Sequence, residues 1–183
     1  VSQHELREKL GYVPQKAVLF SGDIASNILY GNPDGSEAEM TEAATIAQAT
    51  EFIEQKKKKY KSTISQGGSN VSGGQKQRLS IARAIAKHPD VYIFDDSFSA
   101  LDYKTDATLR AKLKEKTSES TVMIVAQRIS TILHADQIIV LDDGQIVGKG
   151  THKELLKNCE AYYQIASSQL SENELEEDLK EVE

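Results

Sequence analysis

Several residue types are scarce in this sequence of 183 residues: it has no tryptophan, one cysteine, two methionines and three prolines. The single cysteine, Cys159, has no partner for an internal disulfide, and without a group of thiols a structural zinc site is not expected. No apolar run approaches the ~20 residues that cross a bilayer, which excludes a membrane span within these residues. Residues 1–9 carry charges throughout and so show no signal peptide. These absences indicate a reducing compartment.

Basic charge in excess is also missing. The net charge is -6, but residues 172–183 alone hold seven acids and one base, so the rest of the chain is balanced. A nucleic-acid-binding domain is expected to show a basic face, and the charge distribution of this sequence does not predict one, which argues against nucleic-acid binding. Its only basic run, residues 56–59, has no interleaved aromatic or glycine and is interpreted as a solvated helix end or loop.

What is present is the composition and patterning of an ordinary globular domain. The chain is 39% hydrophobic and 27% charged, and period-two apolar runs alternate with helical periodicity. This alternation predicts an α/β protein with a mostly parallel sheet. Strands are expected at residues 10–13, 91–94 and 121–126, a hairpin at 138–141 and 145–147, and helices at 36–48, 51–55 and 75–87, with a further helix containing Leu109 and Leu113. Capping boxes are expected at Ser36 with Glu39 and at Thr151 with Glu154.

The acidic end of the chain has two interpretations. Leu175, Leu179 and Val182 have helical spacing among the acids, which would suit an amphipathic partner helix. A frayed, solvated tail is the expectation, because so charged a segment buries little apolar surface. Just before it, His152 is expected at the surface, and Tyr162 and Tyr163 are expected to pack.

The strongest chemical signal is the run Val71-Ser72-Gly73-Gly74-Gln75 at the start of the helix expected at 75–87. Glycines let a backbone approach a ligand, and a helix N-terminus offers free N–H groups and positive potential. An ordinary loop with an N-cap explains the run equally well by itself. A buried strand ending in Asp95 and Asp96 follows, and ligands of open α/β sheets gather at such strand ends. Together these features favour an anion site.

With these motifs the sequence resembles the nucleotide-binding domain of an ATP-binding-cassette (ABC) exporter, up to about Ala166. The resemblance implies a P-loop NTPase-like α/β core with an inserted helical subdomain. The matching segments are residues 71–75 for the signature motif, 91–95 for the Walker B strand, 99–102 for the D-loop, Gln15 for the Q-loop glutamine, 125–128 for the switch loop and 18–31 for the stretch after the Q-loop.

The resemblance also assigns roles, with ATP and Mg²⁺ as cofactors. Asp95 and Gln15 would hold the metal; Asp96, Gln127 and Gln15 would be catalytic; and Ser72, Gly73, Gly74, Gln75 and Asp102 would contact nucleotide. Such sites form between two nucleotide-binding domains, so the signature would serve the partner's ATP. For Asp96 a residual positioning role is an equal alternative, and Asp102 is also expected to cap a helix.

One expected piece is missing, because no Gly-x-x-x-x-Gly-Lys-Ser/Thr occurs in the chain. We therefore expect a portion of a nucleotide-binding domain that is truncated at its N-terminus, with transmembrane helices further upstream in the longer protein. Alone it should bind ATP negligibly and be inactive. The expected divisions are a core segment at 1–34, a helical subdomain at 35–88, further core at 89–158, and a C-terminal helix with the acidic tail at 159–183.

Three departures from the family pattern bear on catalysis. Asp96 stands where the family usually has glutamate, Gln127 where it usually has histidine, and residues 65–68 read Ser-Gln-Gly-Gly instead of Gly-Glu-Arg-Gly. An amide can donate a hydrogen bond but cannot carry a proton at neutral pH. The hypothesis is thus a heterodimeric exporter at the cytoplasmic face of the membrane, contacting coupling helices, with this chain's own site degenerate. Alternatives are a soluble ABC ATPase of translation or DNA maintenance and an inactive regulatory half.

Overall fold

A computed structural model describes residues 1–180, which form two compact units that divide after Val125. The first unit contains α1 (Gln3–Lys9), β1 (Leu10–Val13), β2 (Gly22–Asp23), α2 (Ile24–Ile28), α3 (Glu37–Ile46), α4 (Thr50–Glu54), β3 (Thr63–Ile64), α5 (Gly73–Ala86), β4 (Val91–Asp95), α6 (Tyr103–Lys116) and β5 (Thr121–Val125). The second contains α7 (Ile129–Ile132), β6 (Ile138–Asp142), β7 (Gln145–Gly150), α8 (His152–Asn158), α9 (Glu160–Ser167) and α10 (Glu172–Lys180). Within residues 1–180 no helix has the length and apolar character of a membrane span.

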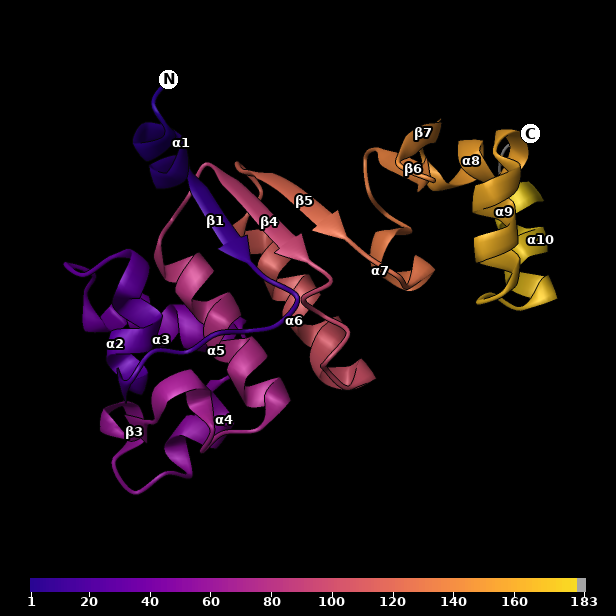
Figure 1. The fold of residues 1–183 in the computed structure, drawn as a ribbon. Coiled ribbons are helices and arrows are strands. Elements are labelled where there is room, and N and C mark those ends of the chain that lie inside the picture. Colours follow the sequence, from indigo (N-terminus) through magenta and orange to yellow (C-terminus); the bar gives the residue numbers. More distant parts are fainter. Residues whose placement is uncertain (181–183) are drawn as a thin grey trace. The chain divides into compact units, whose positions relative to one another are not determined.

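The first unit is built on a three-stranded sheet in the order β1-β4-β5, with all strands parallel (Figure 1). Val13 pairs with Phe94, and Phe94 pairs with Ile124. The α/β prediction with a parallel sheet is confirmed, and the predicted strands lie within about one residue of the observed ones. Because the strands are parallel, their carboxyl ends meet at one edge, which we call the carboxyl edge.

The two faces of this sheet differ in burial. Val13 and Phe94 are fully buried and belong to the core that α5 and α6 complete. On the other face Tyr12 is 55% exposed and Met123 is 57% exposed, with Ile93 paired between them. Within the first unit, one apolar face of the parallel sheet is therefore uncovered, whereas such sheets normally have both faces covered.

Helix α5 organises the first unit. Ser72 is its N-cap, and Gln75 completes a capping box, so the helix begins at Gly73 rather than at the predicted Gln75. Its apolar side is fully buried against α2, α3 and β1, and includes Leu79, Ile81 and Ile85. Burying each such side chain contributes roughly 1.5–3 kcal/mol, so this helix anchors the unit.

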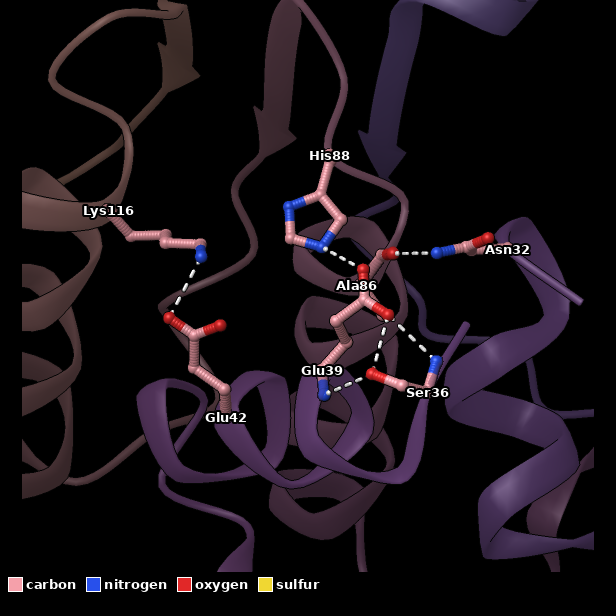
Figure 2. Close-up of polar contacts among 7 residues, drawn as sticks. All are labelled: Asn32, Ser36, Glu39, Glu42, Ala86, His88 and Lys116. Atoms are coloured by element: carbon pink, nitrogen blue, oxygen red, sulfur yellow. Dashed lines mark hydrogen bonds and ion pairs between the residues drawn. The ribbon is translucent and has the colours of Figure 1, made fainter. Parts of the chain in front are cut away.

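Helix α3 is attached to its neighbours by charged side chains, as Figure 2 shows. Glu42 forms an ion pair of 2.8 Å with Lys116 of α6, and Glu39 lies 3.4 Å from the His88 ring after α5. Glu39 also closes the predicted capping box with Ser36. These pairs are exposed, so each contributes little stability and mainly orients α3.

The hairpin of the second unit turns where the sequence predicts, at Asp143 and Gly144. Both have positive φ, 45° and 76°, which is the backbone of a tight two-residue hairpin turn. The strand β7 extends to Gly150, three residues beyond the predicted end, because Gly150 pairs with Ile138. At Gly148 a Cβ would lie 2.7 Å from the Cys159 sulfur, so only glycine lets α8 and α9 approach this closely.

The expectation of a frayed acidic tail is wrong for the described residues. Helix α10 packs on α8 and α9, with Leu175 only 8% exposed and Leu179 against the same apolar cluster. Val182, the third residue of the predicted stripe, lies outside the described residues. The leucine spacing was the correct signal, and burial of this stripe outweighs the repulsion among the acids.

The prediction of a surface His152 is also wrong. His152 is 4% exposed, its Nδ1 lies 2.7 Å from the Tyr162 hydroxyl, and its Nε2 lies 3.1 Å from an Asp178 oxygen of α10. Tyr162 packs, as predicted, and it is 2% exposed, whereas Tyr163, which was also predicted to pack, is 39% exposed. Burial, together with the Asp178 charge, raises the pKa of Tyr162 to about 12. The tyrosine thus remains protonated and bonds with the imidazole that holds α10.

We expect this tyrosine to make stability depend on alkaline pH. Because its folded pKa lies above the ordinary value of about 10, its contribution is complete below pH 10 and is lost as the pH rises toward 12. The free energy of unfolding should fall by roughly 1.4 kcal/mol per pH unit in this window relative to Tyr162→Phe. Urea denaturation between pH 8 and 12 measures it. Tyr163→Phe, at the exposed neighbour, should keep the parent's curve; an identical curve for Tyr162→Phe would contradict the prediction.

Candidate functional site

The carboxyl edge brings together side chains that are more than 80 positions apart in the chain. Gln15, just after β1, donates from Nε2 to an Asp96 oxygen at 3.2 Å. The Tyr12 hydroxyl donates to an Asp95 oxygen at 3.1 Å. The parallel register of β1 and β4 brings these residues together, because it sets Val13 beside Phe94 and so places the residues that follow each strand next to each other. Gln15, Asp95 and Asp96 therefore meet as the sequence predicts, and Tyr12 joins them.

Tyr12 is the site residue that the sequence interpretation missed. It lies on the exposed face of β1, two residues before Pro14, and the hydrogen bond to Asp95 raises its pKa. Strand alternation could have found it, since Tyr12, Ile93 and Asp95 belong to the same face of neighbouring strands. The phenol therefore remains a hydrogen-bond donor to the carboxylate.

The turn after β4 is held in an unusual backbone. Asp96 has φ of 45°, in the left-handed region, and its N–H donates to the Val125 carbonyl at 2.9 Å. The fully buried Ser97 donates from its hydroxyl to the Val13 carbonyl at 2.8 Å. These two bonds tie the turn to both neighbouring strands. They fix the position of the Asp96 carboxylate.

The donor set at the carboxyl edge fits a hard divalent cation. Asp95 and Asp96 are partly exposed, and together with Gln15 they offer only carboxylate and amide oxygens. Mg²⁺ binds to one or two carboxylates and keeps several waters, so a partly open edge suits it. Among residues 1–180, no group of three or more histidine, cysteine, aspartate or glutamate side chains is placed to hold a metal ion by itself.

The second set of predicted residues forms a turn at the start of α5, residues 72–75, which we call the Ser72 turn. Ser72 and Gly73 are exposed, and a Cβ built at Gly73 would meet no atom within 4 Å. The Ser72 oxygen accepts from the Gln75 N–H at 3.2 Å, and the Gln75 side chain accepts from the Ser72 N–H. The turn thus faces open space, with its first N–H groups ordered by the capping box.

The Ser72 turn lies beside the segment before α6. A Cβ at Gly74 would be 3.4 Å from the Ala100 carbonyl oxygen. Asp102 caps α6 through Thr105, as predicted, and these hydrogen bonds to Thr105 hold the Asp102 pKa below its ordinary value. Asp102 is exposed and remains an anion at neutral pH. Its side chain is occupied by the cap.

Gln127 belongs to the second unit. Its carbonyl oxygen accepts from Gln169 Nε2 at 2.8 Å, and Gln169 Oε1 accepts from the Ile129 N–H at 2.9 Å. One side chain therefore braces the backbone on both sides of Arg128. Gln169 was not singled out from the sequence, and a lone glutamine between two helices carries no local signal.

These features define an α/β fold of the P-loop NTPase type, as found in the nucleotide-binding domains of ABC exporters. A family model described as ABC transporter matches residues 1–99, more than half of the chain. The chain therefore belongs to the ABC transporter family.

Relatives of this chain are ABC transporter proteins. It is 48% identical over 163 residues to an uncharacterized ABC transporter ATP-binding protein of Mycobacterium tuberculosis, covering 87% of this chain. It is 42% identical over 164 residues to a putative multidrug export ATP-binding/permease protein of Staphylococcus aureus, covering 90% of this chain. The chain spans 28% of the length of each relative.

A solved structure has the same fold. The structure of a bacterial Atm1-family ABC exporter with ATP bound superposes with a TM-score of 0.90 at 38% identity. The match covers 94% of this chain and 30% of that exporter. The similarity thus includes nearly all of this chain.

We expect Ser97→Ala to destabilise the first unit. The substitution removes a hydroxyl that is fully buried and bonded to Val13, which should lower the free energy of unfolding by about 1–3 kcal/mol. The control is Ser118→Ala, at an exposed turn, where a change within about 0.5 kcal/mol is expected. Urea denaturation followed by circular dichroism measures both. Equal stabilities of the two variants would show that the Ser97 bond contributes nothing.

Proposed function

We propose that this chain is part of the nucleotide-binding domain of an ABC exporter and couples ATP binding and hydrolysis to export at the cytoplasmic face of the membrane. The single observation that carries the proposal is that one chain presents both an open Ser72 turn and a carboxyl edge where Gln15, Asp95 and Asp96 meet. An ATP site of this family uses these two elements from opposite chains, as the family resemblance implies.

At the carboxyl edge, this chain's residues would serve its own ATP. Asp95 and Gln15 are the groups that would hold Mg²⁺, which supplies charge neutralisation for the phosphates when bound. Asp96, steadied by the Gln15 amide, would accept a hydrogen bond from the attacking water. Gln127 would donate a hydrogen bond to a terminal phosphate oxygen.

The remainder of that ATP site would come from a longer polypeptide. The chain contains no Gly-x-x-x-x-Gly-Lys-Ser/Thr, and it spans 28% of the length of its relatives. The uncovered sheet face with Tyr12, Ile93 and Met123 supports this interpretation, because a parallel sheet requires cover on both faces. We propose that the segment with the phosphate-binding loop packs there.

The Ser72 turn would serve the ATP of a second nucleotide-binding domain. Its exposed N–H groups and the positive end of α5 suit a phosphate, and α5 has 14 residues, enough for a full terminal dipole. The Ser72 hydroxyl accepts the Gln75 N–H, so its own hydrogen can donate to a phosphate oxygen. Contacts with transmembrane coupling helices complete the proposed set of partners.

The chain's own site would hydrolyse ATP slowly. Asp96 is one methylene shorter than the family's usual glutamate, and displacements of ~1 Å can cost on the order of 100-fold in rate. Gln127 replaces a histidine and cannot carry a proton. A heterodimer, with this Ser72 turn completing the partner's competent site, fits this asymmetry better than two identical copies. An inactive regulatory half is the second candidate, and the same two residues favour it.

We expect the 183-residue chain alone to bind ATP negligibly. The groups that hold the β- and γ-phosphates are missing from its sequence. Isothermal titration calorimetry with Mg-ATP should give no saturable heat up to millimolar nucleotide. A dissociation constant in the micromolar range would contradict the proposal that another segment is needed.

We expect Ser72→Ala to remove most ATP turnover of the assembled transporter. The substitution takes away a donor to the partner's γ-phosphate, for which a loss on the order of 100-fold in kcat is typical. The substitution also removes the N-cap of α5. Ser36→Ala is the control for this loss, because Ser36 caps α3 in the same capping-box geometry with a 3.2 Å bond. The control should keep the parent's kcat. Unchanged turnover in Ser72→Ala would refute the division between the two sites.

Restoring the usual residues should accelerate this chain's own site. Asp96→Glu with Gln127→His is expected to raise single-turnover hydrolysis at that site by at least about tenfold, since each returns a catalytic group to its usual reach or chemistry. The measurement uses a transporter whose partner site is silenced. No gain, with nucleotide still trapped, would favour the inactive regulatory half.

A further inference from the structure

The segment that contains Gln15, which we call the Gln15 segment, lacks regular secondary structure for eight residues. Residues 14–21 contain no helix and no strand, so no ladder of backbone hydrogen bonds fixes them. Leu19 alone is fully buried there, while Val18 is 54% exposed and Phe20 is 41% exposed. Such a segment would be mobile unless other parts of the chain hold its carbonyl groups.

Two side chains of α5 hold those carbonyl groups. Gln77, only 2% exposed, donates from Nε2 to the Pro14 carbonyl at 3.2 Å. Arg83, six residues further along α5, donates from Nη1 to the Val18 carbonyl at 2.9 Å. Gln15 lies between these two attachment points. Both come from the helix that begins with the Ser72 turn.

Arg83 also binds Asn27 of α2, the helix that follows this segment. Its Nε donates to the Asn27 carbonyl at 2.8 Å and its Nη2 donates to Asn27 Oδ1 at 2.9 Å. Asn27, which is 1% exposed, in turn bonds to both the N–H and the carbonyl of Phe20. One guanidinium therefore fixes the segment directly at Val18 and, through Asn27 of α2, at Phe20.

Two aromatic rings cover this guanidinium, and its bonds go to neutral oxygens. The Arg83 guanidinium carbon lies 4.9 Å from the centre of the Phe20 ring and 5.7 Å from that of Tyr30, and the two rings stack at 4.4 Å. Burial lowers the pKa of Arg83 from its ordinary high value, and the group remains charged at neutral pH. Arginine suits this arrangement, because its three nitrogens each donate to a different oxygen, whereas a lysine has a single nitrogen.

We propose that Gln77 and Arg83 are positioning residues for Gln15, joining the Gln15 segment to α5 so that the glutamine and the Ser72 turn keep a fixed relation. The proposal rests on the function proposed above, in which Gln15 serves this chain's own ATP site and the Ser72 turn serves the ATP of a second nucleotide-binding domain. Gln77 and Arg83 act on the backbone on either side of Gln15, at Pro14 and at Val18.

Hydrogen–deuterium exchange of the 183-residue chain tests the attachment without nucleotide. In Arg83→Met and Gln77→Met, amides of residues 16–31 should exchange at least about tenfold faster, while those of 48–54 stay as in the parent. Arg83→Lys, the variant most certain to fold, should also exchange faster because it lacks the fork. Unchanged exchange of residues 16–31 in Arg83→Lys and Gln77→Met would overturn the proposal.

Arg78 provides a matched control on the same helix. Its guanidinium also lies 4.9 Å from an aromatic centre, that of Phe52, and also donates to a backbone carbonyl, that of Gln48 at 2.7 Å. Arg78→Met should therefore accelerate exchange of residues 48–54 and spare 16–31. Faster exchange of 16–31 in this control as well would show general loosening and overturn the specific role of Arg83.

Turnover of the assembled transporter tests the consequence for catalysis. With enzyme normalised to folded protein, Gln77→Met and Arg83→Lys should lower kcat by about tenfold and change KM for ATP less than twofold, because a misplaced Gln15 affects reaction more than binding. Faster exchange with an unchanged kcat would overturn the positioning role, provided that Gln15→Ala lowers kcat. An unchanged kcat in Gln15→Ala itself would instead refute the function proposed for Gln15.

Discussion

The pairing of β1 with β4 is the constraint on which the first unit depends. These strands are about 80 residues apart in the chain, and their four paired positions set Val13 beside Phe94. The register decides which side chains meet at the carboxyl edge, since a shift by one residue would turn Tyr12 to the core and move Gln15 away from Asp96. Ser97, buried and bonded to Val13, adds a side-chain lock to the same register. The pairing of β1 with β4 therefore sets both the position and the stability of the carboxyl edge.

Helix α5 connects the sheet to the other elements of the first unit. Its apolar side is buried against α2, α3 and β1, and its polar side chains reach the loop after β1. The Ser72 turn and the carboxyl edge are thereby built on one rigid helix and one sheet. A ligand site that combines loops with regular elements in this way keeps exposed groups within a small range of positions.

The sequence predicted most of the elements because their signals are local. The alternation in residues 10–13 and 91–94, the capping boxes at Ser36 and Thr151, and the two-residue turn at Asp143 each act within a few positions. What failed depends on distant contacts. His152 is buried because Tyr162 and Asp178 come to it from two other helices, and no local pattern indicates a histidine with such partners. The docking of α10 was misjudged because its charges outnumber its two apolar contacts, the buried Leu175 and the partly buried Leu179.

The residues of the candidate site also fall into two groups, those with a local sequence signal and those that depend on distant contacts. Gln15, Asp95, Asp96 and the Ser72 turn were identifiable because they belong to motifs with fixed spacing, and the structure brings the first three together. Tyr12, Ser97, Gln77 and Arg83 act through atoms that are distant in sequence, and the register and the packing of α5 alone reveal them. Motifs thus indicate which groups make up the candidate site, and packing indicates what holds those groups in place.

The left-handed backbone at Asp96 has a consequence for anyone who redesigns this edge. Aspartate tolerates positive φ several-fold better than most residues, whereas a longer side chain there costs roughly 1 kcal/mol in the native state. A glutamate at this position would therefore place its carboxylate one methylene further from the backbone and would strain the peptide that carries it. The reach of the side chain and the stability of the turn are set against each other at one pair of torsion angles.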